Sequence, residues 1–239
     1  MPRMGTVNKE KYKTLKDVFD MFTEKNLFKL ISQGYIDGLE GPLSMGKEAN
    51  VFLARSSEEL RVVKIYRLQT CDFNKMYDYI KADPRYTNLK RDRREVIFSW
   101  AQREFRNLLI AREKGMRVPT PYVAKDNILI MECVGGENVA QKLVKHKPQN
   151  IESFFKETIK QITLLYKANL IHADLSGFNI LNDNEKPVLI DMSQATPLNN
   201  PNAEEYLKRD VHNICKLFDK WGLEIDEKKI IEQIKKQKV

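Results

Sequence analysis

The sequence is poor in cysteine and has no long apolar run. Its three cysteines, Cys71, Cys133 and Cys215, are far apart, and an odd, scattered set argues against a disulfide framework and a zinc site. No run approaches the roughly 18 apolar residues of a membrane span. The N-terminus has no apolar segment before a cleavage site, so no secretory signal is expected. These absences predict a soluble protein of the reducing cytoplasm.

The composition is that of a folded domain with an uneven charge. Hydrophobic residues make up 42% and charged residues 31% of the 239 positions, which excludes a disordered or collagen-like chain. The net charge is +8, and residues 81–117 alone hold eleven Lys or Arg against five acidic residues. Such a segment fits a polyanionic partner, although a solvated helix face would also explain it.

Periodicity divides the chain into two parts that meet at Gly135-Gly136. The first part has amphipathic helical spacing, short strand-like runs, a polar stretch without a period and one long helix. The predicted helices are 13–22, 24–33 and 93–114, the strands are 35–40, 49–55, 60–66 and a hairpin turning at Asp126-Asn127, and the irregular stretch is 67–92. The second part is predicted as helices 138–145, 151–169, 203–220 and 227–237, around a loop–strand–loop piece at 171–196.

This layout predicts an α+β fold with two lobes and a cleft at their joint, where ligands tend to bind. We expect an N-terminal helical extension at 1–34, an N-lobe with a small antiparallel sheet at 35–134, and a mostly helical C-lobe at 135–239. The N-lobe would include the irregular stretch 67–92.

The most informative segment, IHADLSGFNILNDNEKPVLIDMS, has three oxygen-bearing side chains at defined spacing. Asp174 follows His172 by two residues, Asn179 comes five residues later, and Asp191 ends an apolar run. A hairpin at 183–184 would return the chain and place Asp191 beside Asn179. Phosphoryl transfer to a hydroxyl requires a carboxylate facing the attacking oxygen and oxygen ligands for Mg²⁺. Asp174 fits the first role, and Asn179 and Asp191 fit the second, whereas surface acids on an ordinary hairpin are the plainer interpretation.

A lysine in the middle of an apolar strand is the second candidate. Lys64 lies in VVKIY, where its ammonium is costly to bury unless it meets an anion. Glu104 on the long helix is the favoured partner, although Glu95 and Glu113 lie on the same helix. Such a pair would direct Lys64 toward nucleotide phosphates; a solvent-facing lysine on an edge strand is the alternative.

Two further segments fit a nucleotide. The loop GPLSMGKEANVF at 41–52 can present backbone N–H groups to phosphates, with Lys47 adding a charge and Ser44 a hydroxyl, yet it has only Gly41 and Gly46 and is also compatible with an ordinary hairpin. The segment MECVGG at 131–136 would act as a hinge. There the Glu132 carbonyl and the Val134 N–H would bind a purine, with Met131 beside it.

The sequence also lacks two features of regulated protein kinases. Ala173, rather than an arginine, follows His172, and no Ala-Pro-Glu follows Asp191. Only 48 residues come after Asp191, so we expect a C-lobe without activation and peptide-docking segments.

Taken together, these motifs resemble the RIO kinases, atypical serine/threonine protein kinases of archaea and eukaryotes. The resemblance rests on SMGKEANVF, WAQREFRNL, HADLSGFN, LIDMSQA and YLKRDVHNI, which span about 44–215. The loop favours the type-one subfamily, with Met45 in place of its usual threonine, and an archaeal source is expected.

The resemblance implies a trimmed bilobal kinase fold with ATP between the lobes and Mg²⁺, or alternatively Mn²⁺, as the metal. Asp174 would be the catalytic aspartate, Asn179 and Asp191 the metal ligands, and Asp191 a site of aspartyl-phosphate formation. Asp210 would brace the catalytic loop, and residues 67–92 would correspond to the family's flexible loop. The implied nucleotide-binding residues are Ser44, Gly46, Lys47, Ala49, Val51, Lys64, Glu104, Met131, Glu132, Val134, Leu181 and Ile190.

The leading functional prediction is therefore an ATP-dependent kinase and ATPase that phosphorylates serine, including its own, and acts in small-ribosomal-subunit maturation. The basic residues 81–117 would lie near rRNA. Two alternatives stay open. One is a small-molecule kinase of the aminoglycoside or choline type, for which the region after Asp191 is short. The other is a nucleotide-gated rRNA-binding assembly factor with little catalysis.

Overall fold

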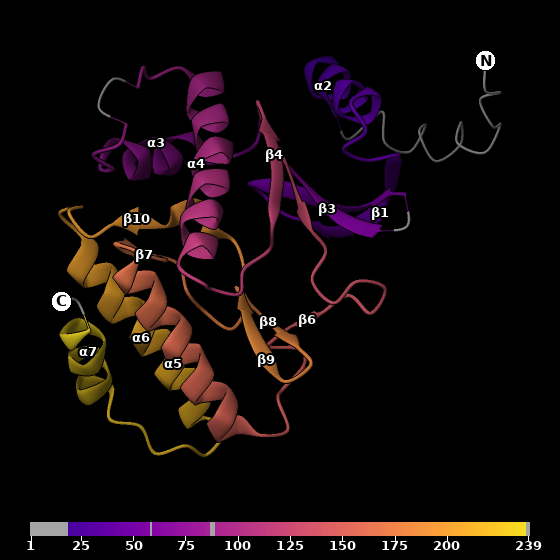
Figure 1. Ribbon diagram of the computed structural model, residues 1–239. Coiled ribbons are helices and arrows are strands. Elements are labelled where there is room, and N and C mark those ends of the chain that lie inside the picture. The colour runs from indigo at the N-terminus through magenta and orange to yellow at the C-terminus, as the bar shows by residue number, and fades with distance from the viewer. Residues whose placement is uncertain (1–18, 58, 87–88, 238–239) are drawn as a thin grey trace.

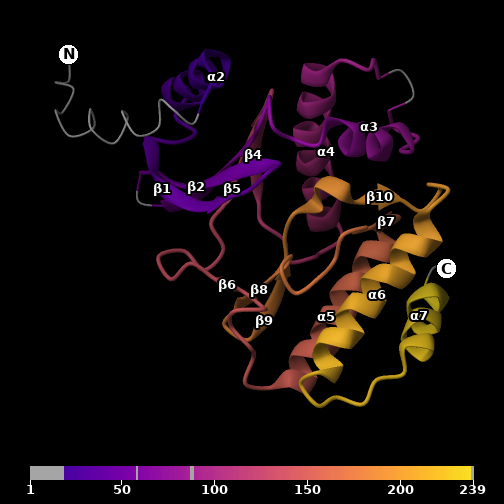
Figure 2. The ribbon, with the colours of Figure 1, turned by 180° about the vertical axis from the view of Figure 1, so that it is seen from behind.

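The computed structural model describes residues 19–57, 59–86 and 89–237. Figure 1 shows a sheet with helices α2, α3 and α4 in one half of the molecule and helices α5, α6 and α7 in the other. Figure 2 shows from behind that the short strands β8 and β9 lie in the second half, below the sheet and beside α5. We call the half built on 35–134 the N-lobe and the half built on 135–237 the C-lobe.

The N-lobe sheet has five antiparallel strands in the order β1-β2-β3-β5-β4. The strands are β1 (Gly38–Met45), β2 (Ala49–Ser56), β3 (Glu59–Tyr66), β4 (Pro121–Lys125) and β5 (Ile128–Glu132). Directly opposed residues in such a sheet share a face. Val51, Lys64 and Leu129 are paired in register and therefore share one face. The other face packs Phe52 and Val63 against α2.

Helix α2 (Met21–Ser32) covers that second face with Leu27 and Leu30. Asp20 caps its N-terminus, because its carboxylate accepts from the N–H groups of Phe22 and Thr23. The predicted break between helices 13–22 and 24–33 is therefore wrong within the described residues, since one helix crosses it. Positions 13–18 of the earlier helix lie outside the described residues.

Two helices pack together on the other side of the N-lobe. The long helix α4 (Arg93–Glu113) confirms the prediction for 93–114 and begins at an Asp92 cap. Helix α3 (Phe73–Lys81) corrects the irregular reading of 67–92: it buries Met76 and Ile80 against α4. These two apolar residues are four positions apart, which is the spacing of one helix face.

The C-lobe is built on two long helices, α5 (Ile151–Lys167) and α6 (Ala203–Asp219), with α7 (Glu227–Lys236) packed beside them. The predicted helix at 138–145 is wrong. This segment instead forms the strand β6 (Gln141–Lys142), which pairs with β8 (Ile180–Asp183). Strand β8 forms a hairpin with β9 (Lys186–Leu189), as expected, and β7 (Leu170–Ile171) pairs with β10 (Thr196–Pro197). The 3₁₀ turn η1 (Met192–Gln194) follows the hairpin. No helix in the described part of the chain is long and apolar enough to cross a membrane.

Candidate active site

Lys64 links the two lobes through its ammonium. Its Nζ lies 3.0 Å from Oε1 of Glu104 on α4 and 2.8 Å from Oδ1 of Asp191 in the C-lobe. Only 6% of the residue is exposed. Burial by itself would lower the pKa of Lys64, but Asp191 and Glu104 together raise it above 10.5, so the ammonium stays charged. The predicted Lys64–Glu104 pair is thereby confirmed, and the helix partner is neither Glu95 nor Glu113.

Tyr66 completes the environment of Glu104 and was not anticipated. Its hydroxyl donates to Oε2 of Glu104, and both side chains are buried. Burial raises the pKa of Glu104 above its ordinary value although Lys64 opposes this, and burial also raises the pKa of Tyr66 well above 10.0. The available signal was strand alternation, because Tyr66 follows Lys64 by two residues and so points to the same face.

The loop that carries Asp174 is held by its backbone. Asp210 on α6, 1% exposed, accepts from the N–H of Ala173 at 2.8 Å and of Leu175 at 2.9 Å, which confirms the expected bracing role. His172 is buried and its Nε2 lies 3.0 Å from the carbonyl of Ile190, so it packs in the loop as predicted. Burial, followed by repulsion from Asp191, raises the pKa of Asp174 above its ordinary value.

The β8–β9 hairpin brings Asn179 and Asp191 together. The N–H of Ile190 donates to the carbonyl of Asn179 at 3.0 Å, as the hairpin prediction required. Ser193 donates to Oδ1 of Asp191 at 2.7 Å. Although burial would raise the pKa of Asp191, Lys64 and Ser193 outweigh it and lower that pKa to about 2. The carboxylate is therefore ionised near neutral pH, with 38% of its side chain exposed.

The side-chain oxygens of Asn179 and Asp191 are suited to a magnesium ion. Asn179 uses its Nδ2 on the carbonyl and the carboxylate of Asp174, at 2.8 and 3.3 Å, which leaves its Oδ1 as an acceptor. Oδ2 of Asp191 has no hydrogen-bonded partner among the described residues. Both are the hard oxygen ligands that Mg²⁺ prefers. No cluster of three or more His, Cys, Asp or Glu suited to a metal occurs in the described ranges. An ion here would therefore complete its shell with nucleotide phosphates and water.

The predicted phosphate loop is shorter than expected. Residues 41–45 belong to β1, which starts at Gly38 rather than at 35, so only 46–48 form the turn before β2. Ser44 lies on β1, and the turn is closed by a hydrogen bond from the Gly46 N–H to the Ala49 carbonyl at 3.0 Å. Lys47 is exposed. Val51 lies opposite Lys64, and therefore beside it on the same face of the sheet.

The turn also holds Glu48, which was not expected as a site residue. The side chain is half-buried, and Lys75 of α3 lies 3.9 Å from its Oε1. Burial, together with the negative charges of Asp191 and Asp174, raises the pKa of Glu48 against the opposing lysines. Glu48 therefore lies close enough to Asp191 and Asp174 to sense their charges, and the charge of Lys75 opposes the rise in the pKa of Asp174.

The expected hinge follows β5. Met131 and Val134 are buried, and the carbonyl of Val134 accepts from the N–H of Ala140 at 2.9 Å. The carboxylate of Glu132 binds Arg117 at 2.7 Å and its N–H donates to the carbonyl of Thr120 at 2.8 Å, so of its polar groups the carbonyl is the one suited to a purine, as expected. Two other predicted nucleotide contacts, Leu181 and Ile190, lie on the hairpin that carries Asn179 and Asp191, and both are half-buried.

The chain matches a known protein family over most of its length. The model of the RIO domain matches residues 50–230. The chain belongs to the RIO family of serine/threonine-protein kinases. The RIO-type kinase Rio1 of Haloferax volcanii is 37% identical over 232 residues, covering 96% of this chain and 80% of that protein. Rio1 of Methanocaldococcus jannaschii is also 37% identical, over 94% of this chain and 78% of its own.

A solved RIO structure shares the fold. The Rio2 kinase–ADP/Mg²⁺–phosphoaspartate complex from Chaetomium thermophilum superposes with a TM-score of 0.64 at 26% identity, over 81% of this chain. This chain spans 59% of that one, so it corresponds to part of the longer protein. The likeness confirms the kinase-like α+β fold expected for this RIO chain.

Proposed function

We propose that this RIO protein binds ATP with Mg²⁺ and transfers the γ-phosphate to a serine or threonine hydroxyl, including serines of its own chain, or to its own Asp191. The proposal includes a cytoplasmic role in small-ribosomal-subunit maturation. The observation that carries it is the pairing of Lys64 with both Glu104 of α4 and Asp191, at 3.0 and 2.8 Å. Asp191 follows the hairpin that also brings Asn179 beside it. This arrangement joins a phosphate-binding cation to a metal-ligand pair.

Each residue has a distinct part in the transfer. Bound magnesium would supply charge neutralisation at the phosphates, held by Asn179 and Asp191. Lys64 would bind the phosphate oxygens, fixed in direction by Glu104. Asp174 would accept the proton of the attacking hydroxyl as its oxygen bonds to the γ-phosphorus and the bond to the ADP oxygen breaks. The raised pKa of Asp174 favours this role, since it brings the base nearer to neutral pH.

Asp191 is also a candidate acceptor of the phosphate, which would give an ATPase cycle. Its Oδ1 is engaged by Lys64 and Ser193, whereas Oδ2 has no hydrogen-bonded partner among the described residues. An ionised carboxylate is a competent nucleophile when one of its oxygens is not engaged in hydrogen bonds. The name of the related Rio2 complex refers to a phosphoaspartate in that protein, which supports the proposal.

The test uses purified protein, Mg²⁺ and γ-labelled ATP, with wild type, Asp174→Ala and Asp191→Ala compared. Hydroxylamine-labile protein label that is lost in Asp191→Ala would support the ATPase cycle. Acid-stable label lost in both variants would favour serine phosphorylation. ATP binding without phosphate release or labelling in any form would refute catalysis and favour a nucleotide-gated assembly factor.

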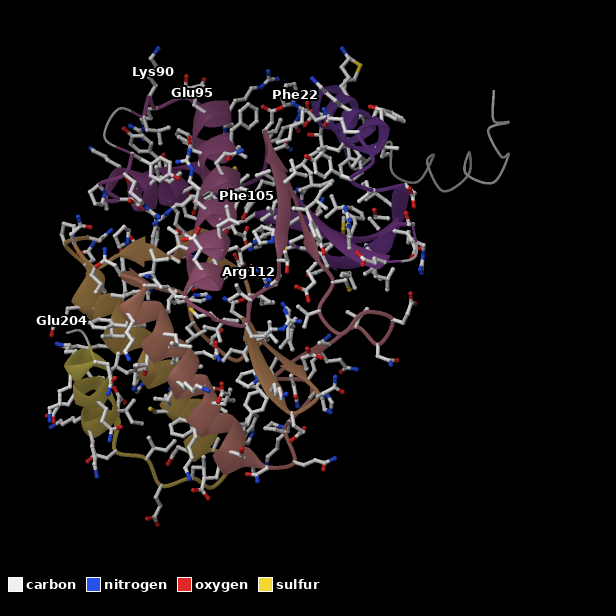
Figure 3. The ribbon with its side chains drawn as sticks, viewed as in Figure 1. Phe22, Lys90, Glu95, Phe105, Arg112 and Glu204 are labelled. Atoms are coloured by element: carbon white, nitrogen blue, oxygen red, sulfur yellow. The ribbon has the colours of Figure 1, made fainter. Side chains whose placement is uncertain are left out.

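The proposed rRNA contact is narrower than the whole basic segment. Arg103 is fully buried, Arg85 is paired with Asp83, and Arg117 is paired with Glu132, so these three are structural. Figure 3 shows Lys90 and Arg112 at opposite ends of α4. The exposed residues at the N-terminal end stack over rings: Arg91 over Tyr77, Arg93 over Phe73 and Arg94 over Phe22, at 5.4, 5.3 and 5.1 Å.

We therefore propose Arg91, Arg93 and Arg94 as the rRNA-facing group. Changing all three to Gln should weaken binding to a small-subunit rRNA transcript and flatten its salt dependence, by about 2 in the logarithmic slope if each neutralises one phosphate. The matched control changes Arg106, Arg112 and Lys114, which are exposed farther along α4. Equal slopes in wild type and in the first triple variant would refute this contact.

A further inference from the structure

The turn that follows Asp191 is tied to α4 by side chains. Asp191 has a left-handed backbone, with φ of 61°, which is strained for a residue other than glycine. The carbonyls of Met192 and Ala195 each accept a hydrogen bond from Nδ2 of Asn107, both at 2.8 Å. Asn107 is fully buried on α4. One amide group therefore closes both ends of η1, directly after Asp191.

The orientation of this amide is fixed from its other side. Oδ1 of Asn107 accepts from Nη1 of Arg85 at 2.9 Å. A flipped amide would lose this bond and would turn its oxygen toward two carbonyl oxygens, so only one orientation satisfies all the contacts. The three hydrogen bonds of Asn107 therefore act together.

Arg85 is itself clamped by a buried acid. Asp83, 1% exposed, accepts from Nη2 and Nε of Arg85 at 2.7 and 2.9 Å and pairs with Arg103 at 3.1 Å. Arg103 in turn donates to the carbonyl of Gln194 at 3.3 Å. Asp83 and Arg85 come directly after α3, so a segment expected to be irregular reaches the turn behind the candidate metal ligand.

We propose that Asn107 is a positioning residue for Asp191: its two donated hydrogen bonds hold the left-handed turn that directs the Asp191 carboxylate toward Lys64, and Arg85 holds Asn107. This inference rests on the proposed function, since it assigns a support to the proposed metal ligand. Asn107 would touch neither nucleotide nor metal. Its loss would therefore weaken the contribution of magnesium to nucleotide binding and leave the adenine contacts at the hinge unchanged.

The variant that separates these effects is Asn107→Asp. It nearly preserves the shape and keeps an oxygen for Arg85, but it cannot donate to Met192 and Ala195. Arg85→Ala is the second variant, which removes the support of Asn107 together with the 3.4 Å hydrogen bond from Nη2 of Arg85 to the Ala195 carbonyl, and leaves Asn107 able to donate. The control is Asn127→Asp: Asn127 is equally buried and its Nδ2 also donates twice, to Thr23 and to the carbonyl of Tyr66.

The measurement is ADP binding by calorimetry, with and without Mg²⁺, next to thermal unfolding of each variant. We expect Asn107→Asp to reduce the magnesium-dependent gain in ADP affinity by about tenfold or more, and Arg85→Ala to reduce it less. Metal-free ADP affinity should stay within about twofold in both. Asn127→Asp should lower thermal stability and keep the full magnesium-dependent gain.

Two results would overturn the inference, and they are distinguishable. A magnesium-dependent gain that is present in wild type and unchanged in Asn107→Asp and Arg85→Ala would leave Asn107 a purely structural residue. ADP binding that magnesium does not strengthen in wild type would refute the proposed function, and this inference with it. Where Asn107→Asp does not fold, the gain measured in Arg85→Ala decides the matter.

Discussion

Replacement of Asp210 tests how far the catalytic loop depends on one buried carboxylate. The side chain is 1% exposed and accepts two backbone N–H bonds, at 2.8 and 2.9 Å, on either side of Asp174. Hydrogen bonds to a charged group contribute about 1.5–3 kcal/mol each. Asp210→Asn keeps one acceptor and turns an NH₂ group toward the other N–H, so it should lower the free energy of unfolding by about 2 kcal/mol. Asp210→Ala leaves both N–H groups unpaired and should cost about 3–6 kcal/mol.

We expect kcat to fall by more than the loss of folded protein at the assay temperature can explain. Ala173 has a left-handed backbone, with φ of 65°, and its N–H is one of the two that Asp210 holds. A displacement of about 1 Å at Asp174 would lower kcat about 100-fold. The KM for ATP should change little, because the hinge and Lys64 lie on other elements.

The assay measures kcat and KM for ATP together with urea unfolding, for Asp210→Asn and for the control Asp219→Asn. Asp219 ends the same helix and is exposed, so its replacement should alter neither kcat nor stability. A kcat within threefold of wild type in folded Asp210→Asn would refute the idea that the carboxylate positions Asp174.

Two further predictions concern the hinge. Burial alone would raise the pKa of Glu132, but hydrogen bonds from Arg117 and Thr120 hold it below 4.5, so its stabilising effect is complete above pH 4.5 and is lost as pH falls through the lowered pKa. Glu132→Gln should therefore lower the free energy of unfolding by about 1 kcal/mol at pH 7 and show a shallower decline below pH 4.5 in urea titrations; parallel curves would contradict this. Gly135→Ala should be destabilising by at least about 1–2 kcal/mol, because φ is 87° and the new Cβ would lie 2.4 Å from the carbonyl oxygen of Asn138. The control is Gly136→Ala, whose Cβ meets no atom within 4 Å. The difference between the two variants in thermal unfolding measures how much of the destabilisation is due to the clash.

The sequence predicted those parts of the site in which local pattern and chemistry agree. An apolar strand around Lys64, a long helix with Glu104 and a hairpin before Asp191 each have a strong signal of their own. The cost of burying an unpaired ammonium then selects the pair that the structure contains. The supporting residues Tyr66 and Asn107 were missed, because their partners lie 38 and 85 or more positions away and come near only when separate elements meet. Ser193 was also missed, although its partner Asp191 is only two residues away.

The mistaken elements have physical causes of the same kind. Residues 138–145 contain good helix formers, yet Gln141 and Lys142 pair with Asn182 and Leu181, some forty positions away. Tertiary pairing therefore overrides local propensity there. Helix α3 is the opposite case, since its signal was local: Asp72 caps it, its side chain accepting from the N–H of Lys75, and two apolar residues one turn apart face α4.

Helix α4 supports both charged side chains that the proposed chemistry needs, Lys64 and Asp191. Glu104 directs Lys64, while Asn107, less than one turn later, holds the turn after Asp191. A rigid helix rises about 1.5 Å per residue, so these two anchors cannot move independently. A shift of α4 along its axis would disturb the phosphate-binding lysine and the metal ligand together. Asp83 pairs with Arg103 and Arg85 donates to Asn107, so both residues fasten this helix from behind the site.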